Sequence, residues 1–270
     1  MDLPQAATLL LKLDKGVLHL TLNRPESRNA MSAEMLADIG RVFDAIRDSR
    51  EVRAVVLRGA GGHFCAGADL KSMMGGGMQA PAPGEVDPIA GVNRAFGAML
   101  RQVAQAPQVV VAICEGAVLG GGFGLACVSD IAFAHADARF GMPETTRGLP
   151  PAQIAPFVVE RIGLTQARRL CLTGAQFRGA EALRLGLVHE VFPSEEELQI
   201  RLGETLAQVM QCAPQANALT KQILLRVGSQ VSDEVLDDAA EKFALCARGP
   251  EAPEGIAAFM QKRSPKWAQP

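Results

Sequence analysis

"EGAVLGGGFGLACVSD", residues 115–130, places glycine at positions 120, 121, 122 and 124 and then continues in small apolar residues. Glycine loses more backbone entropy on folding than any other residue, so a cluster of this density is costly unless the backbone must adopt an unusual conformation or approach something closely. The residues that follow the glycines are typical of a helix. The stretch therefore predicts bare backbone at the point where a helix begins.

A second loop of the same kind, "GGHFCAGADLKSM", occupies residues 61–73. Each loop follows a run rich in β-branched residues, 53–59 or 108–114, which we expect to be a buried strand. Free backbone N–H groups gather at a helix N-terminus, where the helix dipole favours negative charge. Two such loops facing each other would each aim one N–H group at the same oxygen atom. This arrangement is an oxyanion hole, in which one donor is typically worth about 3–4 kcal/mol.

Glu144 is the candidate acid or base, because it follows a proline in "ADARFGMPETTRGLPP", residues 136–151, after a strand-like run. A carboxylate placed opposite an oxyanion hole would serve as a general acid/base. The glycine spacing fits neither a dinucleotide fingerprint nor a phosphate-binding P-loop. Close packing of a helix remains an equal explanation of the glycines taken alone. The three segments together favour an active site.

The composition restricts the classes of partner. The 270 residues include 27 basic and 29 acidic side chains, so no overall charge favours binding to nucleic acid or to an anionic membrane. No apolar run approaches the roughly 18 residues of a membrane span, and the N-terminus lacks the pattern of a signal peptide. The six cysteines lack the spacing of zinc ligands. We expect a cytoplasmic protein with reduced thiols, no metal, and no flavin or nicotinamide.

The secondary-structure pattern predicts an α/β fold. Residues 16–22, 53–59 and 108–114 are expected to be strands, and residues 32–48 a helix with Ser32 as its N-cap. From about residue 194 the pattern is almost wholly helical. The sequence thus predicts an α/β core over residues 1–193 and a helical subdomain over residues 194–270.

Three segments carry a family resemblance: "LNRPESRNAMS" (22–32), "HFCAGADL" (63–70) and "GAVLGGGFGLACVSDIAFAHADARFGMPE" (116–144). In this order they resemble the enoyl-CoA hydratase/isomerase (crotonase) superfamily, and the resemblance extends from about Val17 to "GIAAFMQKR" near the end. It implies a spiral of repeated β-β-α units followed by helices, assembled as a homotrimer or a dimer of trimers. It also implies that the enolate of an acyl-CoA thioester is stabilised in the hole. Coenzyme A would then enter as part of the substrate and not as a cofactor.

The resemblance assigns roles to particular residues. The oxyanion donors would be the N–H groups of Ala68 and Gly121, with Glu144 as the acid/base. The residues expected to contact coenzyme A, including the nucleotide of a neighbouring subunit, are Ser27, Arg28, Ala66, Asp69, Leu70, Phe259 and Lys262. Solvated surface positions are the alternative for Arg28 and Lys262. We expect His63 and His135 to be surface residues without a partner.

The match fails at Gly124, where hydratases of the usual type carry a second glutamate. Hydration needs a base for water and an acid for the α carbon, and one carboxylate can act as both in turn. An isomerase that moves a double bond needs only one carboxylate to carry the proton, so it is a serious alternative. Hydrolysis of the thioester and a non-catalytic role in binding coenzyme A are further alternatives. A glycine at this position is also expected to leave empty volume near the β carbon of the acyl chain, which would suit a β-branched substrate.

Two segments, "VLGGGFGLACVSD" (118–130) and "PAQIAPFVVERIGLTQARRL" (151–170), look like the isohexenylglutaconyl-CoA hydratases of acyclic terpene catabolism. The substrate of those enzymes is branched at the β carbon. The resemblance therefore implies hydration of a β-branched 2-enoyl-CoA by a single glutamate.

Overall fold

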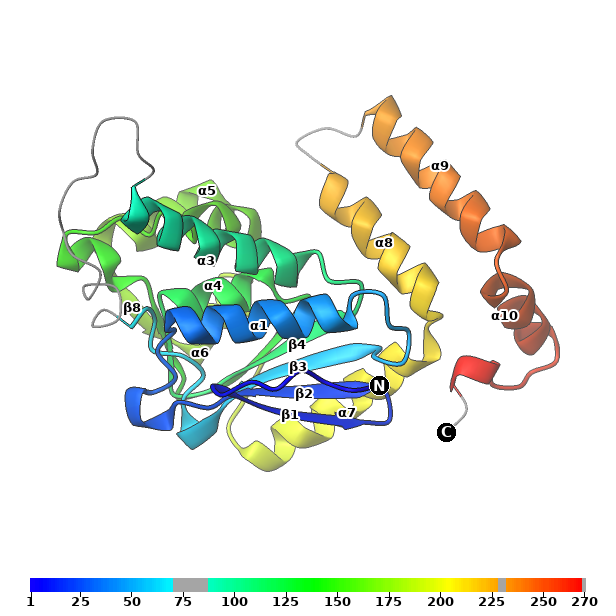
Figure 1. Cartoon of the computed structure of the whole chain (residues 1–270), viewed down its shortest axis with the longest axis horizontal. Helices are drawn as coiled ribbons and strands as arrows, with labels where there is room; N and C mark the ends of the chain where they lie inside the picture. Colours follow the sequence, from blue (N-terminus) through cyan, green and yellow to red (C-terminus); the bar gives the residue numbers. More distant parts are fainter. Residues whose placement is uncertain (70–86, 228–231, 269–270) are drawn as a thin grey trace.

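A six-stranded sheet lies at the centre of the computed structural model, which describes residues 1–69, 87–227 and 232–268 (Figure 1). Its strands, in spatial order, are β1 (Leu9–Asp14), β2 (Val17–Leu22), β3 (Ala54–Gly59), β4 (Val109–Cys114), β6 (Ile131–His135) and β9 (Glu190–Phe192). The β1–β2 pair is antiparallel and all other neighbours in this sheet are parallel. The predicted strands over residues 16–22, 53–59 and 108–114 are confirmed to within one residue. The run "LLLKLD" of β1 was not expected to be a strand.

A second, three-stranded sheet consists of β5 (Ala117–Leu119), β7 (Arg139–Gly141) and β8 (Gln176–Arg178). The chain alternates between the two sheets. After β4 in the large sheet come β5 in the small sheet and helix α4 (Gly121–Val128), and after β6 come β7 and helix α5 (Ala155–Thr173). Each strand–strand–helix unit makes one turn of a spiral. The expected crotonase-like spiral of β-β-α units is confirmed.

Helices α1 (Ala33–Ile46) and α3 (Pro88–Ala104) lie with α4 on one face of the large sheet (Figure 1). Helix α1 begins as predicted, because the Ser32 side chain accepts a hydrogen bond from the Met35 N–H group. Apart from Asp38, which accepts hydrogen bonds from Thr8, its buried face is apolar, so the main core lies between these helices and the sheet. The short helix α6 (Gly179–Arg184) leads toward β9.

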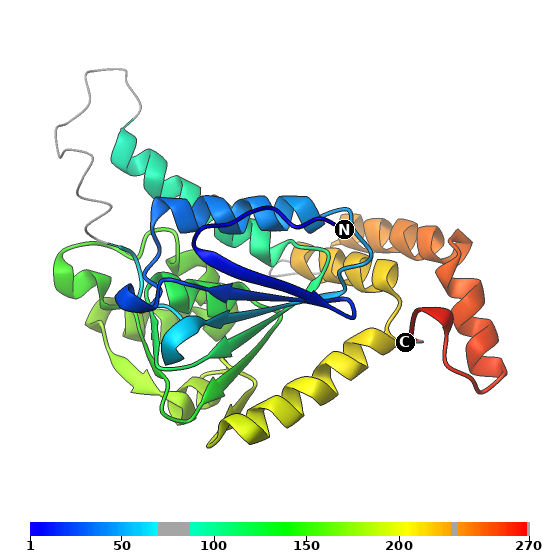
Figure 2. The ribbon, with the colours of Figure 1, turned by 60° about the horizontal axis from the view of Figure 1, so that its bottom comes forward.

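The C-terminal helices are α7 (Glu195–Gln211), α8 (Pro214–Arg226), α9 (Asp233–Arg248) and α10 (Glu251–Met260). Helix α7 covers the other face of the large sheet, where Leu198 and Leu202 join a core cluster with strand residues such as Phe133. Helix α8 is tied to the body by Lys221, whose Nζ donates to the Asp130 carboxylate at 2.7 Å. Helices α9 and α10 stand away from the body (Figure 2). In the part of the chain that the structure describes, no helix is both long and apolar enough to cross a membrane.

Candidate active site

The two glycine-containing loops lie side by side near the start of α4. Cys65 forms a parallel bridge with Val118, in which the Cys65 N–H group donates to the Ala117 carbonyl and the Leu119 N–H group donates to the Cys65 carbonyl, both at 2.9 Å. The loop after β3 is therefore held against the loop before α4. The prediction that the two glycine-containing loops meet is confirmed for these residues.

Glycine is required at the point where the loops touch. Gly67 has a φ of +102°, and a Cβ atom at this position would lie 3.3 Å from the Leu119 carbonyl oxygen. Gly120, with a φ of +48°, approaches Gly67 from the other loop. Side chains at either position would be strained and would separate the loops. The glycine cluster thus serves close approach of backbone, as the sequence indicates.

Ala68 and Gly121 each have an N–H group that no secondary structure of the described residues engages. Met31 donates to the Gly67 carbonyl and accepts from the Asp69 N–H group, so the groups of Ala68 itself face the opposite side of this bridge. Ala68 is exposed to solvent. Gly121 is the first residue of α4, where an N–H group has no intrahelical acceptor. Both features fit the predicted role of oxyanion donor.

Aromatic packing on one side of helix α4 holds this helix in place. Phe123 is fully buried and makes edge-to-face contacts with Phe140 and Phe177, which stack on each other. On its other side, Gly122 packs so closely on Cys65 that a Cβ atom would lie 2.6 Å from the Cys65 carbonyl oxygen. Burial raises the pKa of the Cys65 thiol to about 12, so this sulfur stays protonated and is a poor nucleophile.

Glu144 lies directly beside the donor loops. It belongs to a short 3-10 helix, Pro143–Arg147, and its Oε1 atom is next to Gly120, where a Cβ atom would lie 2.6 Å away. Its Oε2 atom is buried and, among the described residues, has no hydrogen-bond partner. Burial raises the pKa of this carboxyl group, with a smaller opposing effect from Arg147. A carboxyl group with a raised pKa and an oxygen atom free of described partners can both accept and return a proton.

The environment of Gly124 corrects one expectation. The predicted empty volume is absent, because a Cβ atom at this position would lie 3.2 Å from Leu100 Cδ1 and 3.4 Å from Ile154 Cγ2. Phe96, one turn earlier on α3, packs in the same way over Gly121. Where the family pattern has a second glutamate, this chain therefore has an apolar wall. No feature of the glycine cluster itself indicated these residues, which come from α3 and from the residue before α5.

Most of the residues predicted to contact coenzyme A are near the hole. Ser27 and Arg28 form the end of a 3-10 helix, Pro25–Ser27, and the Arg28 carbonyl accepts a hydrogen bond from the Ala66 N–H group at 3.0 Å. The Arg28 side chain is exposed. The Asp69 carboxylate accepts a hydrogen bond from Arg24 at 2.9 Å, an arginine that the sequence analysis did not single out. Leu70 lies outside the described residues.

Phe259 and Lys262 are not brought to the hole. Phe259 belongs to α10, Lys262 follows the end of this helix, and α10 lies beyond α8 from the helix α4 that begins at Gly121 (Figure 1). Phe259 is 86% exposed. Their predicted contact is with coenzyme A bound to a neighbouring subunit, and it stays a prediction.

His63 is a further correction. It was expected to be a surface residue without a partner, but it is half-buried, and its Nδ1 atom accepts a hydrogen bond from the Ala117 N–H group at 3.1 Å. Burial and the nearby Arg28 and Arg139 lower the pKa of His63, which keeps the ring neutral for this acceptor role. His63 therefore helps to join the two loops. The same expectation is wrong for His135, which is half-buried and whose Nδ1 atom accepts a hydrogen bond from the Asp137 N–H group.

Among the described residues, no three His, Cys, Asp or Glu side chains are grouped as a metal site would need. The candidate site consists of two backbone N–H groups predicted to be donors, one carboxylate and an apolar wall. Such an arrangement can polarise a carbonyl group and move a proton on an adjacent carbon atom.

Comparison with known proteins agrees with this chemistry. The family model described as enoyl-CoA hydratase/isomerase matches residues 12–270. The chain belongs to the enoyl-CoA hydratase/isomerase family. Proteins of this family hydrate or isomerise enoyl-CoA thioesters, and an acyl-CoA substrate is consistent with the site.

Individual relatives are similar over nearly their whole length. The crystal structure of an enoyl-CoA hydratase/isomerase from Marinobacter aquaeolei is 57% identical, with a TM-score of 0.94, and covers 97% of this chain and 99% of its own. The structure of Pseudomonas aeruginosa AtuE is 58% identical, with a TM-score of 0.91, and covers 97% of this chain and 100% of its own. A 2,3-dehydroadipyl-CoA hydratase from Escherichia coli is 30% identical over 95% of this chain and 97% of its own.

Proposed function

We propose that this protein hydrates a 2-enoyl-CoA thioester that is branched at the β carbon. The observation that carries the proposal is the position of Glu144 beside Gly120, with an apolar wall at Gly124 in place of a second carboxylate. The similarity to a 2,3-dehydroadipyl-CoA hydratase and the sequence resemblance to isohexenylglutaconyl-CoA hydratases support the reaction type. An isohexenylglutaconyl-CoA of acyclic terpene catabolism is the substrate we propose.

In the proposed reaction, the thioester carbonyl oxygen accepts hydrogen bonds from the N–H groups of Ala68 and Gly121. This withdraws electron density from the β carbon and stabilises the enolate that forms next. The Glu144 carboxylate removes a proton from water as the water oxygen bonds to the β carbon. The same carboxyl group then returns that proton to the α carbon, which regenerates the carbonyl group. One molecule of water is added, and Glu144 ends in its starting state.

The apolar wall supports the branched substrate. Phe96, Leu100 and Ile154 pack against the glycines at 121 and 124, so a hydrocarbon branch on the β carbon would meet apolar atoms. A second carboxylate at this position would have to be buried among the same atoms at considerable cost. We infer that the loss of the second glutamate suits the acyl group and that Glu144 carries both proton transfers.

The deciding experiment uses straight and β-branched enoyl-CoA thioesters in ¹⁸O-labelled water, with the products identified by mass spectrometry. We expect one labelled oxygen on the β carbon and a preference for the branched substrate. A double bond that moves without uptake of label would establish the isomerase alternative, which one glutamate also supports. Release of free coenzyme A would indicate a hydrolase. Binding of acyl-CoA without any product would indicate a non-catalytic binding protein.

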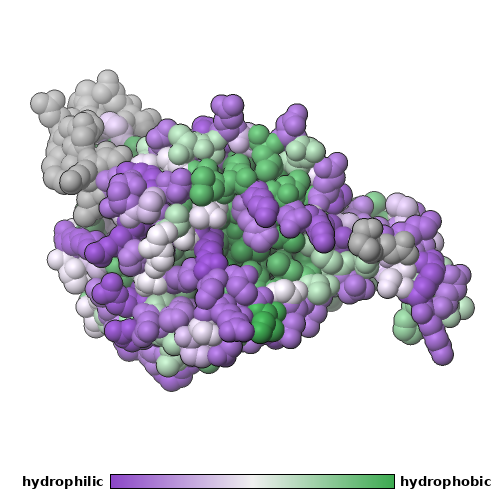
Figure 3. Space-filling model, turned by 90° about the horizontal axis from the view of Figure 1, so that it is seen from below, coloured by the Kyte–Doolittle hydropathy of each residue, from purple (hydrophilic) through white to green (hydrophobic). Residues whose placement is uncertain are grey.

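We also infer that the protein is a homotrimer or a dimer of trimers. No residue of α9 is buried within the described chain, and Phe243 on this helix is 76% exposed. Hydrophobic surface also gathers on the body beside the projecting C-terminal helices (Figure 3). Exposed apolar surface that is gathered in one region is typical of a subunit interface. Light scattering should give a trimer or hexamer, and Phe243→Glu should shift the protein toward the monomer. A monomeric wild-type protein would contradict the inference.

A further inference from the structure

Residues 24–31, here called the Arg24 loop, lie along residues 63–69, the Ala68 loop. Three backbone hydrogen bonds join them: Ala66 donates to Arg28 at 3.0 Å, Met31 to Gly67 at 2.8 Å and Asp69 to Met31 at 2.9 Å. These bonds hold the residues on both sides of Ala68 and leave the groups of Ala68 turned away from the Arg24 loop. The direction of the Ala68 N–H group therefore depends on how firmly the two loops are held together.

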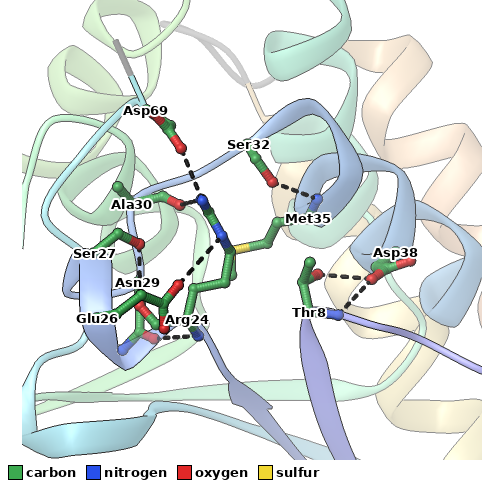
Figure 4. A network of polar contacts seen from close by, with 10 residues as sticks. All are labelled: Thr8, Arg24, Glu26, Ser27, Asn29, Ala30, Ser32, Met35, Asp38 and Asp69. Atoms are coloured by element: carbon green, nitrogen blue, oxygen red, sulfur yellow. Dashed lines mark hydrogen bonds and ion pairs between the residues drawn. The ribbon is translucent and has the colours of Figure 1, made fainter. Parts of the chain in front are cut away.

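One side chain joins the two loops beyond their backbones. The Arg24 guanidinium donates from Nη1 to the Ala30 carbonyl at 2.6 Å and from Nη2 to Asp69 Oδ2 at 2.9 Å (Figure 4). A looser ion pair connects its Nε atom to exposed Glu26 at 3.9 Å. The side chains of Arg24 and Asp69 are only 23% and 17% exposed, so solvent screens this ion pair less than an ion pair at the surface.

The other end of Arg24 is also fixed. Its backbone N–H group donates to Asn29 Oδ1 at 2.9 Å. The Asn29 side-chain amide donates in turn to the carbonyl groups of Ala60 at 2.9 Å and His63 at 2.6 Å. Asn29 is fully buried. The backbone of Arg24 is thus held in place by Asn29. Because the Arg24 side chain binds Asp69, it restricts the movement of the Ala68 loop.

Charge gives Arg24 a second effect. Asp69 follows Ala68 directly, and in the proposed reaction negative charge develops on the oxygen atom bound by the Ala68 N–H group. A carboxylate near that oxygen raises the energy of the enolate by like-charge repulsion. The Arg24 guanidinium, in direct contact with Asp69, offsets this repulsion. Arg24 thus holds the Ala68 loop and neutralises the Asp69 carboxylate. Both effects lower the energy of the enolate more than that of the bound substrate.

We propose that Arg24 is a positioning residue for the reaction, which fixes the Ala68 donor and neutralises Asp69 beside it. The inference rests on the proposed function insofar as Ala68 binds the thioester oxygen. It adds a residue that contacts neither the acyl group nor the proton-transferring carboxylate. It also makes the Arg24 loop, which carries Ser27 and Arg28, a direct mechanical support of the hole.

The test compares Arg24→Met, Arg24→Lys and Arg24→Met/Asp69→Asn with the wild type. Arg24→Met should lower kcat about tenfold or more and change KM less than about threefold, because the lost interaction acts mainly in the transition state. Arg24→Lys should recover part of this loss, since it keeps the charge without the two-pronged contact. The double variant should have a higher kcat than Arg24→Met, because Asp69→Asn removes a negative charge from the residue next to Ala68.

A spectroscopic measurement separates positioning from general stability. The infrared stretching frequency of a ¹³C-labelled thioester carbonyl falls when N–H groups bind its oxygen, and in Arg24→Met it should return toward the value of the free thioester. Arg47→Met is the matched control, because it breaks an exposed ion pair with Asp44 far from the loops, and it should leave both readings unchanged. If Arg24→Met melts at a lower temperature but keeps the wild-type kcat and carbonyl frequency, Arg24 is only structural.

The same measurement distinguishes failure of this inference from failure of the proposed function. Carbonyl frequency is read on a bound thioester and needs no turnover. A wild-type protein that leaves the frequency unshifted would contradict the oxyanion hole and with it the proposed function. A wild-type shift that persists unchanged in Arg24→Met would overturn the role of Arg24 alone.

Discussion

The Glu144 carboxylate lies against the backbone of Gly120, with its Oε1 atom only 2.6 Å from the place where a Cβ atom at position 120 would be. Gly120 directly precedes Gly121, whose N–H group is a predicted oxyanion donor. The helix start that carries the predicted donor and the carboxylate proposed to move the proton are thus in contact through one glycine. Because Gly120 has no side chain, the Glu144 carboxylate can lie close to the N–H group of Gly121.

Gly120→Ala should therefore lower kcat by about tenfold or more, because the new methyl group displaces Glu144 and the residue must keep a φ of +48°. Kinetics with the preferred enoyl-CoA would measure the effect. Gly186→Ala is the matched control: its φ is +74°, but no atom lies within 4 Å of the added methyl group. If both variants lose stability equally and neither loses activity, the contact between Gly120 and Glu144 has no part in catalysis.

Glu144→Gln should lower turnover by about a hundredfold or more and leave affinity for coenzyme A nearly unchanged. Burial raises the pKa of Glu144, and the carboxylate form must accept the first proton. In the wild type, kcat/KM should thus fall as the pH drops through this raised pKa, with a midpoint above the ordinary range of glutamate. A pH profile that stays flat through that range would remove Glu144 from the mechanism.

The raised pKa of Glu144 also affects stability. Below the ordinary pKa of glutamate the carboxyl group is neutral in both folded and unfolded states, and burial has no charge to penalise. As the pH rises through the folded-state pKa, the folded protein must hold a desolvated charge and loses stability. Glu144→Gln should accordingly melt at a higher temperature than the wild type at neutral pH, and this difference should vanish in acid. Thermal melts at several pH values would check it, and a constant difference would be evidence against the effect.

Gly121→Pro should remove one donor and lower kcat by about a hundred- to a thousandfold. Gly121 is the first residue of α4, a position at which proline suits the helix, so the backbone fold should survive. Gly121→Ala keeps the N–H group but adds a methyl group 3.2 Å from Met31 Sδ and 3.3 Å from Phe96 Cζ. The alanine variant should therefore retain much more activity than the proline variant. Equal losses would mean that crowding, and not the lost donor, is responsible.

The sequence predicted the strands that carry the site and the loops that form it, because their signals are local. The β-branched runs at 53–59 and 108–114 and the glycines at 120–124 specify buried strands and close backbone approach from neighbouring residues alone. The short strands β5, β7 and β8 were not predicted as a sheet, since each has only three residues and is defined by partners distant in the sequence.

The parts of the site that the sequence did not predict depend on tertiary contacts. Leu100 and Ile154 fill the space beside Gly124, although each lies more than twenty positions away in the chain. His63 acquires a partner in Ala117 only because the two loops are bridged. Arg24 was visible within the "LNRPESRNAMS" segment, but its contact with Asp69 spans 45 positions. Such pairings are set by the fold and leave no periodic signal.

The last prediction concerns the wall at Gly124. Gly124→Glu places a carboxylate against Leu100 and Ile154, where a Cβ atom alone would already lie 3.2–3.4 Å from their side chains. The longer side chain must displace this wall or turn into the acyl site, and it should lower the melting temperature because its charge is buried without a partner. Either movement disturbs the apolar surface that a β branch would contact. The ratio of kcat/KM for isohexenylglutaconyl-CoA to that for unbranched crotonyl-CoA should thus fall by about tenfold or more.

Gly124→Gln separates volume from charge, because it has nearly the same shape as glutamate and carries no charge. If an intact apolar wall favours the branched substrate, both variants should shift the ratio toward crotonyl-CoA to a similar extent. Only the glutamate variant should add activity on crotonyl-CoA, since it alone restores a second acid/base. Both ratios are measured under the same conditions as the wild type. An unchanged ratio in both variants, or a wild type that already prefers crotonyl-CoA, would contradict the branched-substrate proposal and favour the isomerase alternative.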